Sequence, residues 1–154
     1  MKAQDIMKIS ISTWMKAGQM AKGLIQQDAS KGKFQNEKKN ISYKSKQYTD
    51  YKSAGMVGKR GKKLKGFEGV SINRNTKFKD MKLTGETLRR ISVKPLKDSF
   101  ELNYERGEIV LGNDDADIYD LRNANRDKVM DTIMADISRK ANKYMAEDVN
   151  IKIG

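Results

Sequence analysis

The nine residues Leu83–Ile91, L-T-G-E-T-L-R-R-I, lie between two parts of the chain that differ in character. Thr84 can cap a helix through its hydroxyl group, and Glu86 then lies in the first turn, where the helix dipole favours a negative charge. The chain before this stretch has the pattern of helix and basic loop, and the chain after it that of strand, acidic turn and long helix. The pattern therefore predicts a short capped helix that joins the two parts.

The two sides of this short helix differ in chemistry. Leu88 and Ile91 can point together toward a core, whereas Arg89 and Arg90 cannot both follow them. We interpret Arg89 and Arg90 as residues that contact a partner in an assembly, with a solvated helix face as the alternative.

An amphipathic pattern over residues 3–29 predicts one long N-terminal helix, because apolar residues recur every three or four positions. These positions are Met7, Ile11, Trp14, Gly18, Ala21 and Ile25. Residues 8–12 alternate as a strand does, but we favour helix throughout. Gly18 and Gly23 each weaken a helix by roughly 1 kcal/mol or permit close packing. Gly32 is the expected C-terminal cap.

Residues 32–69 form the least regular part of the chain, with many glycines and little hydrophobic periodicity. A short helix can form over residues 45–54, and residues 59–65 have the composition of a flexible basic loop. Because so long an irregular segment is unusual in an isolated domain, we expect it to contact another molecule. The candidate residues for contact with a protein or DNA are Lys59, Arg60, Lys62, Lys63, Lys65, Tyr48 and Tyr51, together with Arg89 and Arg90.

Positive charge is concentrated in the middle of the chain. The 154 residues carry a formal net charge of +12. Residues 31–97 hold 20 Lys and Arg against 5 Asp and Glu, and the remainder of the chain is slightly acidic. Such a segment indicates an acidic protein partner, nucleic acid, or simply a soluble surface.

The sequence contains neither Cys nor His, which removes the commonest general base and the thiolate and imidazole metal ligands. No nucleophile–base pair can be proposed, so we expect no catalytic site, no cofactor and no metal, and therefore no enzyme. No run approaches the ~18 apolar residues of a membrane span.

Two short motifs match known binding sites only in part. Gly58–Gly61, G-K-R-G, fits the G-x-x-G loop of KH domains, but the apolar helices that flank such a loop are missing. Residues 113–117 carry oxygen side chains at alternate positions, as a calcium loop does. Ile118 and Ala124, however, stand where such a loop needs Gly and Glu. We therefore interpret the first as a solvated or partner-facing loop and the second as a turn that leads into a helix.

Strand patterns and a long helix make up the last third of the chain. A strand over residues 92–96 contains Pro95, so it lies at a sheet edge or ends early, and residues 99–111 have the pattern of a hairpin. Asn123 can cap a helix over residues 124–147, and residues 149–153 alternate as a final short strand would. The fold class expected is α+β, with a long helix at each end and a small antiparallel sheet, in one domain of residues 1–154.

Three stretches, in this order, resemble a family of tailed-phage virion-morphogenesis proteins, the tail-completion or head–tail joining type typified by the phage Mu G-like proteins. Residues 32–34 followed by 43–52 are similar to the family's glycine-led loop and its segment rich in tyrosine and lysine. Leu83–Ile91 is similar to its T-G-x-L-R-x-S-I signature, with one residue added after Gly85. Residues 121–129 resemble the start of its last helix.

This resemblance implies a small α+β subunit that works without enzymatic activity in a ring at the phage neck. Its partners would be further copies of itself, portal or adaptor proteins, tail proteins and, through a basic face, packaged DNA. It would be assembled in the host cytoplasm and end in the neck or tail of the virion. A basic nucleic-acid-binding module is the alternative function.

Overall fold

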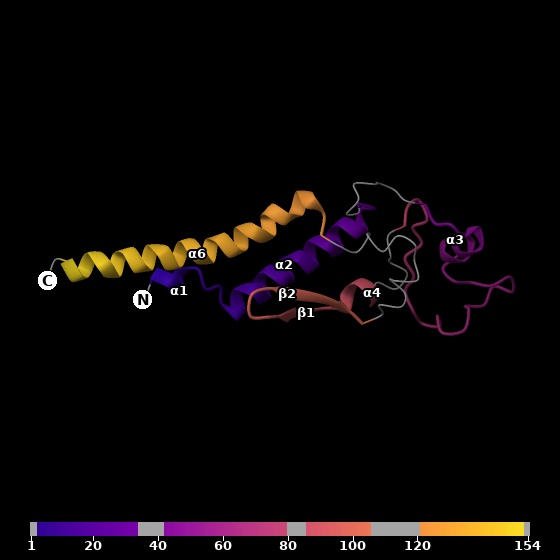
Figure 1. The fold of residues 1–154 in the computed structure, drawn as a ribbon. Helices are drawn as coiled ribbons and strands as arrows, with labels where there is room; N and C mark the ends of the chain where they lie inside the picture. Colours follow the sequence, from indigo (N-terminus) through magenta and orange to yellow (C-terminus); the bar gives the residue numbers. More distant parts are fainter. Residues whose placement is uncertain (1–2, 34–41, 80–85, 106–120, 153–154) are drawn as a thin grey trace. The chain divides into compact units, whose positions relative to one another are not determined.

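The computed structural model describes residues 3–33, 42–79, 86–105 and 121–152 (Figure 1). It confirms the predicted α+β class, with helices in both terminal regions and a two-stranded antiparallel sheet. The elements in chain order are α1 (Ala3–Ile6), α2 (Ile11–Ser30), α3 (Lys46–Ser53), α4 (Glu86–Arg89), β1 (Ile91–Pro95), β2 (Phe100–Tyr104) and α6 (Asn123–Lys152).

The chain divides into two compact units. Unit 1 contains residues 1–23, 93–103 and 123–154, and unit 2 contains residues 24–92 and 104–122. Helix α2 and both strands contribute residues to each unit. The single domain expected for residues 1–154 stays a prediction.

The N-terminal helix is broken, so the prediction of one helix over residues 3–29 is wrong between Ile6 and Ile11. Ser10 causes the new start: its hydroxyl accepts a hydrogen bond from the backbone N–H of Thr13 at 3.1 Å, as an N-terminal cap does. Its carbonyl accepts from Trp14 N at 3.0 Å and so begins α2. The strand-like alternation marked this break, although the residues before Ser10 form no strand.

The buried face of α2 repeats every four residues. Ala17, Ala21, Ile25 and Ala29 are all buried, whereas Met7 and Ile11 of the predicted apolar stripe are exposed. Three of the four buried residues are alanines, and such small side chains allow neighbouring elements to approach the helix axis closely. This face of the helix therefore packs largely through small residues.

Gly18 shows how close this approach is in unit 1. A Cβ atom at Gly18 would lie 2.3 Å from Val93 Cγ1 of β1 and 3.1 Å from the Phe100 ring of β2. Beside it, the rings of Trp14 and Phe100 pack with centroids 6.4 Å apart. The β1–β2 hairpin thus rests on α2 at a position that only glycine fits.

Helix α2 ends at Ser30, and Gly32 caps it as predicted. Gly32 N donates to the carbonyl of Ala29 at 3.2 Å, and Lys33 N donates to that of Asp28 at 2.9 Å. Gly32 has a φ of +66°, so these two bonds form a Schellman cap, which needs a left-handed residue. The same arrangement ends α3, which forms over Lys46–Ser53 within the predicted range and is capped by Ser45.

The short helix at the centre of the sequence pattern is α4 in unit 2. Leu88 and Ile91 are buried as predicted, and Gln26 Nε2 of α2 donates to the carbonyl of Leu88 at 2.6 Å. Thr84, the expected cap, lies outside the described residues. α4 is therefore attached to α2 through both packing and a hydrogen bond.

The sheet consists of β1 and β2, joined by a turn in which Leu96 N donates to Ser99 O at 2.8 Å. Pro95 is the last residue of β1, so the strand ends at a residue that has no N–H to donate. β2 confirms the first arm of the hairpin expected over residues 99–111, and its partner among the described residues is β1. The expected second arm lies outside those residues.

Helix α6 begins one residue before the predicted range and continues to Lys152, so the strand predicted over residues 149–153 is wrong. Extending an existing helix adds a hydrogen bond for each residue fixed, and five alternating residues do not outweigh that gain. The helical spacing of apolar residues predicts a buried stripe along this helix that includes Val129, Ile133, Met134 and Met145. Val129 and Ile133 are buried, but Met134 and Met145 are exposed. None of the helices in the described ranges is long and apolar enough to cross a membrane.

The two interior glycines of α2 should respond to alanine in opposite ways. Gly18→Ala should lower the free energy of unfolding by about 1–3 kcal/mol, because the added methyl group would overlap Val93. Gly23→Ala should raise it by about 0.5–1 kcal/mol, because a Cβ there meets nothing within 4 Å and alanine favours helix. Urea denaturation of both variants measures these changes, and equal effects would contradict the packing described.

Candidate functional site

The segment predicted to be a flexible basic loop is a hydrogen-bonded turn in unit 2. Val57 and Lys63 form an antiparallel bridge. Gly61 N donates to Gly58 O, and Gly58 N donates to Lys62 O, both at 2.9 Å. Gly61 has a φ of +71°, the left-handed conformation that glycine adopts readily. Residues 57–65, called the basic turn below, therefore have a defined backbone.

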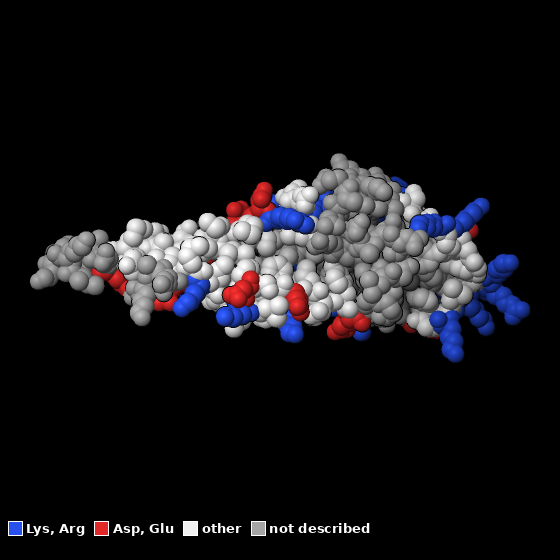
Figure 2. All heavy atoms as spheres, viewed as in Figure 1, with Lys and Arg blue, Asp and Glu red and all other residues white. Residues whose placement is uncertain are grey.

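Four cations of the basic turn extend into solvent. Lys59, Arg60, Lys62 and Lys65 are exposed and form no ion pair with any described residue. Lys63, the fifth predicted contact residue, instead donates through Nζ to Gly55 O at 2.9 Å and to Val70 O at 3.4 Å. Figure 2 shows Lys and Arg side chains gathered over the part of unit 2 that carries α3 and this turn.

Tyr48 and Lys52 of α3 form a cluster with Tyr43 that the sequence did not reveal. The rings of Tyr43 and Tyr48 pack with centroids 5.2 Å apart. Lys52 is fully buried, and its Nζ donates to the Tyr43 hydroxyl at 2.5 Å. Tyr51 lies on the same helix and is half-buried. A lysine among polar residues gives no sequence signal of burial, so Lys52 was missed.

Arg89 and Arg90 are both exposed at the end of α4. Arg90 Nη1 lies 3.3 Å from Glu105 Oε2, an exposed ion pair of the kind that contributes little to stability. These arginines, the tyrosines and the basic turn all belong to unit 2. The role of Arg89 and Arg90 in assembly stays a prediction.

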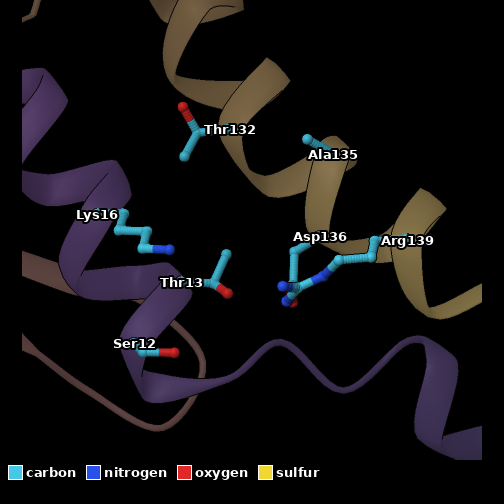
Figure 3. A pocket seen from close by; sticks show the side chains of 7 residues that line it. All are labelled: Ser12, Thr13, Lys16, Thr132, Ala135, Asp136 and Arg139. Carbon is cyan, nitrogen blue, oxygen red and sulfur yellow. The ribbon is translucent and has the colours of Figure 1, made fainter.

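Unit 1 contains a polar pocket of about 300 Å³ between α2 and α6 (Figure 3). Its lining residues are Ser12, Thr13 and Lys16 of α2 and Thr132, Ala135, Asp136 and Arg139 of α6. Figure 3 shows Thr13 and Asp136 facing each other across the pocket, with Arg139 reaching back over Asp136. The sequence pattern gave no sign of this site, because its residues come from helices more than one hundred positions apart.

Asp136 is a buried carboxylate held by three partners. Arg139 Nη2 donates to Oδ1 at 2.5 Å, and Lys140 Nζ lies 3.0 Å from Oδ2 in an ion pair without hydrogen-bond alignment. Burial alone would raise the pKa of Asp136, but the Lys140 ammonium, the Arg139 guanidinium and the Thr13 hydroxyl together hold this pKa below its ordinary value. Asp136 is thus an ionised anchor between the two helices of unit 1.

A larger and more apolar groove of about 710 Å³ lies in unit 1 between residues 7–11 and the β1–β2 turn. Trp14 lines it, and the indole N–H of Trp14 is buried without a hydrogen-bond partner among the described residues. Met7 and Ile11 line the same groove and are exposed. The groove therefore offers apolar surface that the described chain does not cover.

Of the two partial motifs in the sequence, one lies in the basic turn and the other lies outside the described residues. The G-x-x-G segment joins two extended stretches of the basic turn, whereas a KH loop joins two helices. Residues 113–117, which resemble part of a calcium loop, lie outside the described residues. Within the described ranges, no three acidic side chains gather in an arrangement that could hold a metal ion.

Comparison with known proteins gives no relative: no protein-family model, curated protein or solved structure matches this chain. The resemblance to tailed-phage tail-completion proteins therefore stays a hypothesis. The functional argument depends on the surfaces described above.

Asp136 should make unit 1 sensitive to acid. An aspartate in an unfolded chain titrates near ~3.9, and the folded value is lower, so the ionised carboxylate stabilises the protein above about pH 4 and loses this effect as pH falls through the folded pKa. Asp136→Asn should lower the free energy of unfolding at pH 7 by about 1–3 kcal/mol. Urea denaturation at pH 7 and pH 3 should show the difference from the parent protein shrinking in acid.

Asp131→Asn is the matched control for this variant. Asp131 lies on the same helix, is exposed and carries the same charge. Its substitution should change the free energy of unfolding by less than about 0.5 kcal/mol at either pH. A similar loss in both variants would show that the net charge of α6, and not the buried contacts of Asp136, sets the acid sensitivity.

Proposed function

We propose that this protein is a structural virion protein of a tailed bacteriophage, a neck or tail-completion subunit that joins the head connector to the tail as part of a ring. Two things support the proposal: the ordered motifs that resemble this family, and an apolar surface on unit 1 suited to contact with a second protein. The surface is the observation that carries the argument.

All the large apolar side chains that are exposed in the described chain belong to unit 1. They are Met7, Ile11, Met20, Met130, Met134 and Met145, with exposed fractions between 42% and 69%. Single exposed apolar residues are ordinary, but a group of them on one unit is typical of an interaction surface. Five of the six are methionines, whose flexible side chains adapt to a partner's shape.

Three of these methionines form a line along α6. Met130, Met134 and Met145 are separated by 4 and 11 residues, spacings that return to nearly the same side of a helix. The buried Val129 and Ile133 precede the first two by one position each, so the line lies beside the buried face. A second protein that covers this line would extend the apolar packing of α6 outward.

The apolar groove beside Trp14 provides a second, different surface on the same unit. In a closed ring, each subunit contacts the next through two unlike patches, so that one surface of a copy meets another surface of its neighbour. The methionine line on α6 and the groove form such a pair of unlike apolar patches. We therefore propose that another copy of this chain is the first partner of unit 1, with connector and tail proteins above and below the ring.

Replacing two methionines of the line by lysine should weaken self-association. In Met130→Lys/Met134→Lys, two ammonium groups would have to be desolvated at the interface, and the association constant should fall about tenfold or more. Light scattering coupled to size-exclusion chromatography over a range of concentrations measures this change. Electron microscopy of the parent protein, alone and mixed with connector and tail proteins, should show closed rings.

Asn142→Lys/Ala146→Lys is the matched control, because both residues are exposed on another side of α6 and have the same spacing and charge change. This control should assemble as the parent does. A parent protein that stays monomeric and binds no connector or tail protein would overturn the proposed function. Equal loss of assembly in both double variants would instead reject the methionine line as the interface.

A further inference from the structure

The basic turn has a charge density that the described protein does not neutralise. Five cations occupy residues 59–65 with no acidic residue among them. Glu68 lies three residues after this segment, but its Oε2 accepts a hydrogen bond from the backbone N–H of Gly66 at 2.8 Å. Lys63 is engaged with two carbonyl groups. Lys59, Arg60, Lys62 and Lys65 are left as solvent-exposed cations without an ion-pair partner in the described chain.

The backbone that carries these cations is already ordered. The Val57–Lys63 bridge closes the turn, and Leu64 N donates to Met56 O at 2.8 Å just beyond it. Met56 is buried and follows the cap of α3, so the base of the turn is attached to the core of unit 2. A partner that binds the tip therefore does not have to order the backbone first, which lowers the entropy cost of binding.

From this geometry we infer that the basic turn is a binding site for the phosphate backbone of duplex nucleic acid. Four exposed cations within seven residues suit a polyanion with one charge per ~1.7 Å of its axis. Lys59 and Arg60 occupy the tip between Gly58 and Gly61, and neither glycine carries a side chain that could obstruct a phosphate group. Contacts of this kind hold a duplex without reading its sequence.

The neighbouring side chains favour duplex over single-stranded nucleic acid. Single strands bind proteins largely through bases stacked on exposed aromatic rings. Tyr43 and Tyr48 pack against each other instead, and the Tyr43 hydroxyl also accepts a hydrogen bond from the Lys52 ammonium. Two of the three tyrosines near the turn are thus engaged within the protein.

The turn also lacks what a membrane surface would need. Peripheral membrane elements combine basic residues with exposed apolar side chains that enter the lipid. The apolar residues of the turn, Val57 and Leu64, are half-buried, and the exposed positions are glycine or cationic. The inference does not depend on assembly through unit 1, because every residue in it belongs to unit 2.

Salt dependence tests the inference directly. A fluorescently labelled 30-base-pair duplex of random sequence should bind the full chain, with a slope of log affinity against log salt of about −3.6 if all four cations pair with phosphates. Lys59→Gln/Arg60→Gln should make this slope shallower by about 2 and weaken binding at 0.1 M salt on the order of 50-fold. Circular dichroism of the variant should match the parent, because both side chains are exposed.

The matched control is Lys31→Gln/Lys77→Gln, which removes the same charge from exposed positions of unit 2 outside the basic turn. It should leave the slope and the affinity within about threefold of the parent. Absence of duplex binding at 20 mM salt, or equal losses in both double variants, would overturn the site. So would tighter binding to polyglutamate, to single-stranded DNA of equal length or to phosphatidylserine vesicles than to the duplex. Because duplex binding and self-association are measured separately, failure of one proposal leaves the other standing.

Discussion

Close packing against α2 is the constraint on which the described structure depends. The helix contributes to both units, and its buried positions are mostly alanine and glycine. At Gly18 the β1–β2 hairpin approaches so closely that no side chain fits, and further along Gln26 holds the carbonyl of Leu88. Small residues bring elements close together, but each buries little apolar surface. A chain with 37% hydrophobic residues can fold this way only if additional contacts fix its helices.

Those additional contacts are polar and lie in both units. In unit 1, the Asp136 carboxylate interacts with the Arg139 guanidinium, the Lys140 ammonium and the Thr13 hydroxyl. Burial strengthens these interactions because water competes less for the charges. In unit 2, the ammonium groups of Lys52 and Lys63 bind oxygen atoms inside the same unit. A strongly basic chain thus uses part of its charge as internal structure. The cations that remain outside are therefore a better guide to partners than the net charge is.

The sequence predicted which helices form better than it predicted the residues at which they begin and end. It also predicted the buried helix faces better than the buried charged residues. Periodicity located α2 and α6, and Gly32 marked the C-terminal end of α2 correctly because capping is local chemistry. The break before Ser10 was missed because the apolar spacing continued across it. Met134 and Met145 were predicted to be buried, because apolar periodicity does not distinguish a helix face that the protein covers from one that stays exposed. The burial of Lys52 and Asp136 could not be predicted from the sequence, because it depends on contacts between separate segments of the chain.

The two units carry unlike surfaces, and this difference bears on how the chain would work. Apolar contacts like those offered by the unit 1 methionines are insensitive to salt and depend on shape, so they suit a permanent interface. Phosphate contacts like those offered by the basic turn depend strongly on salt and tolerate sliding, so they suit a partner that moves past the protein. A ring subunit that is fixed to its neighbours while nucleic acid passes through needs both kinds of surface. The two surfaces consist of different residues in different units, so a substitution in one leaves the residues of the other unchanged.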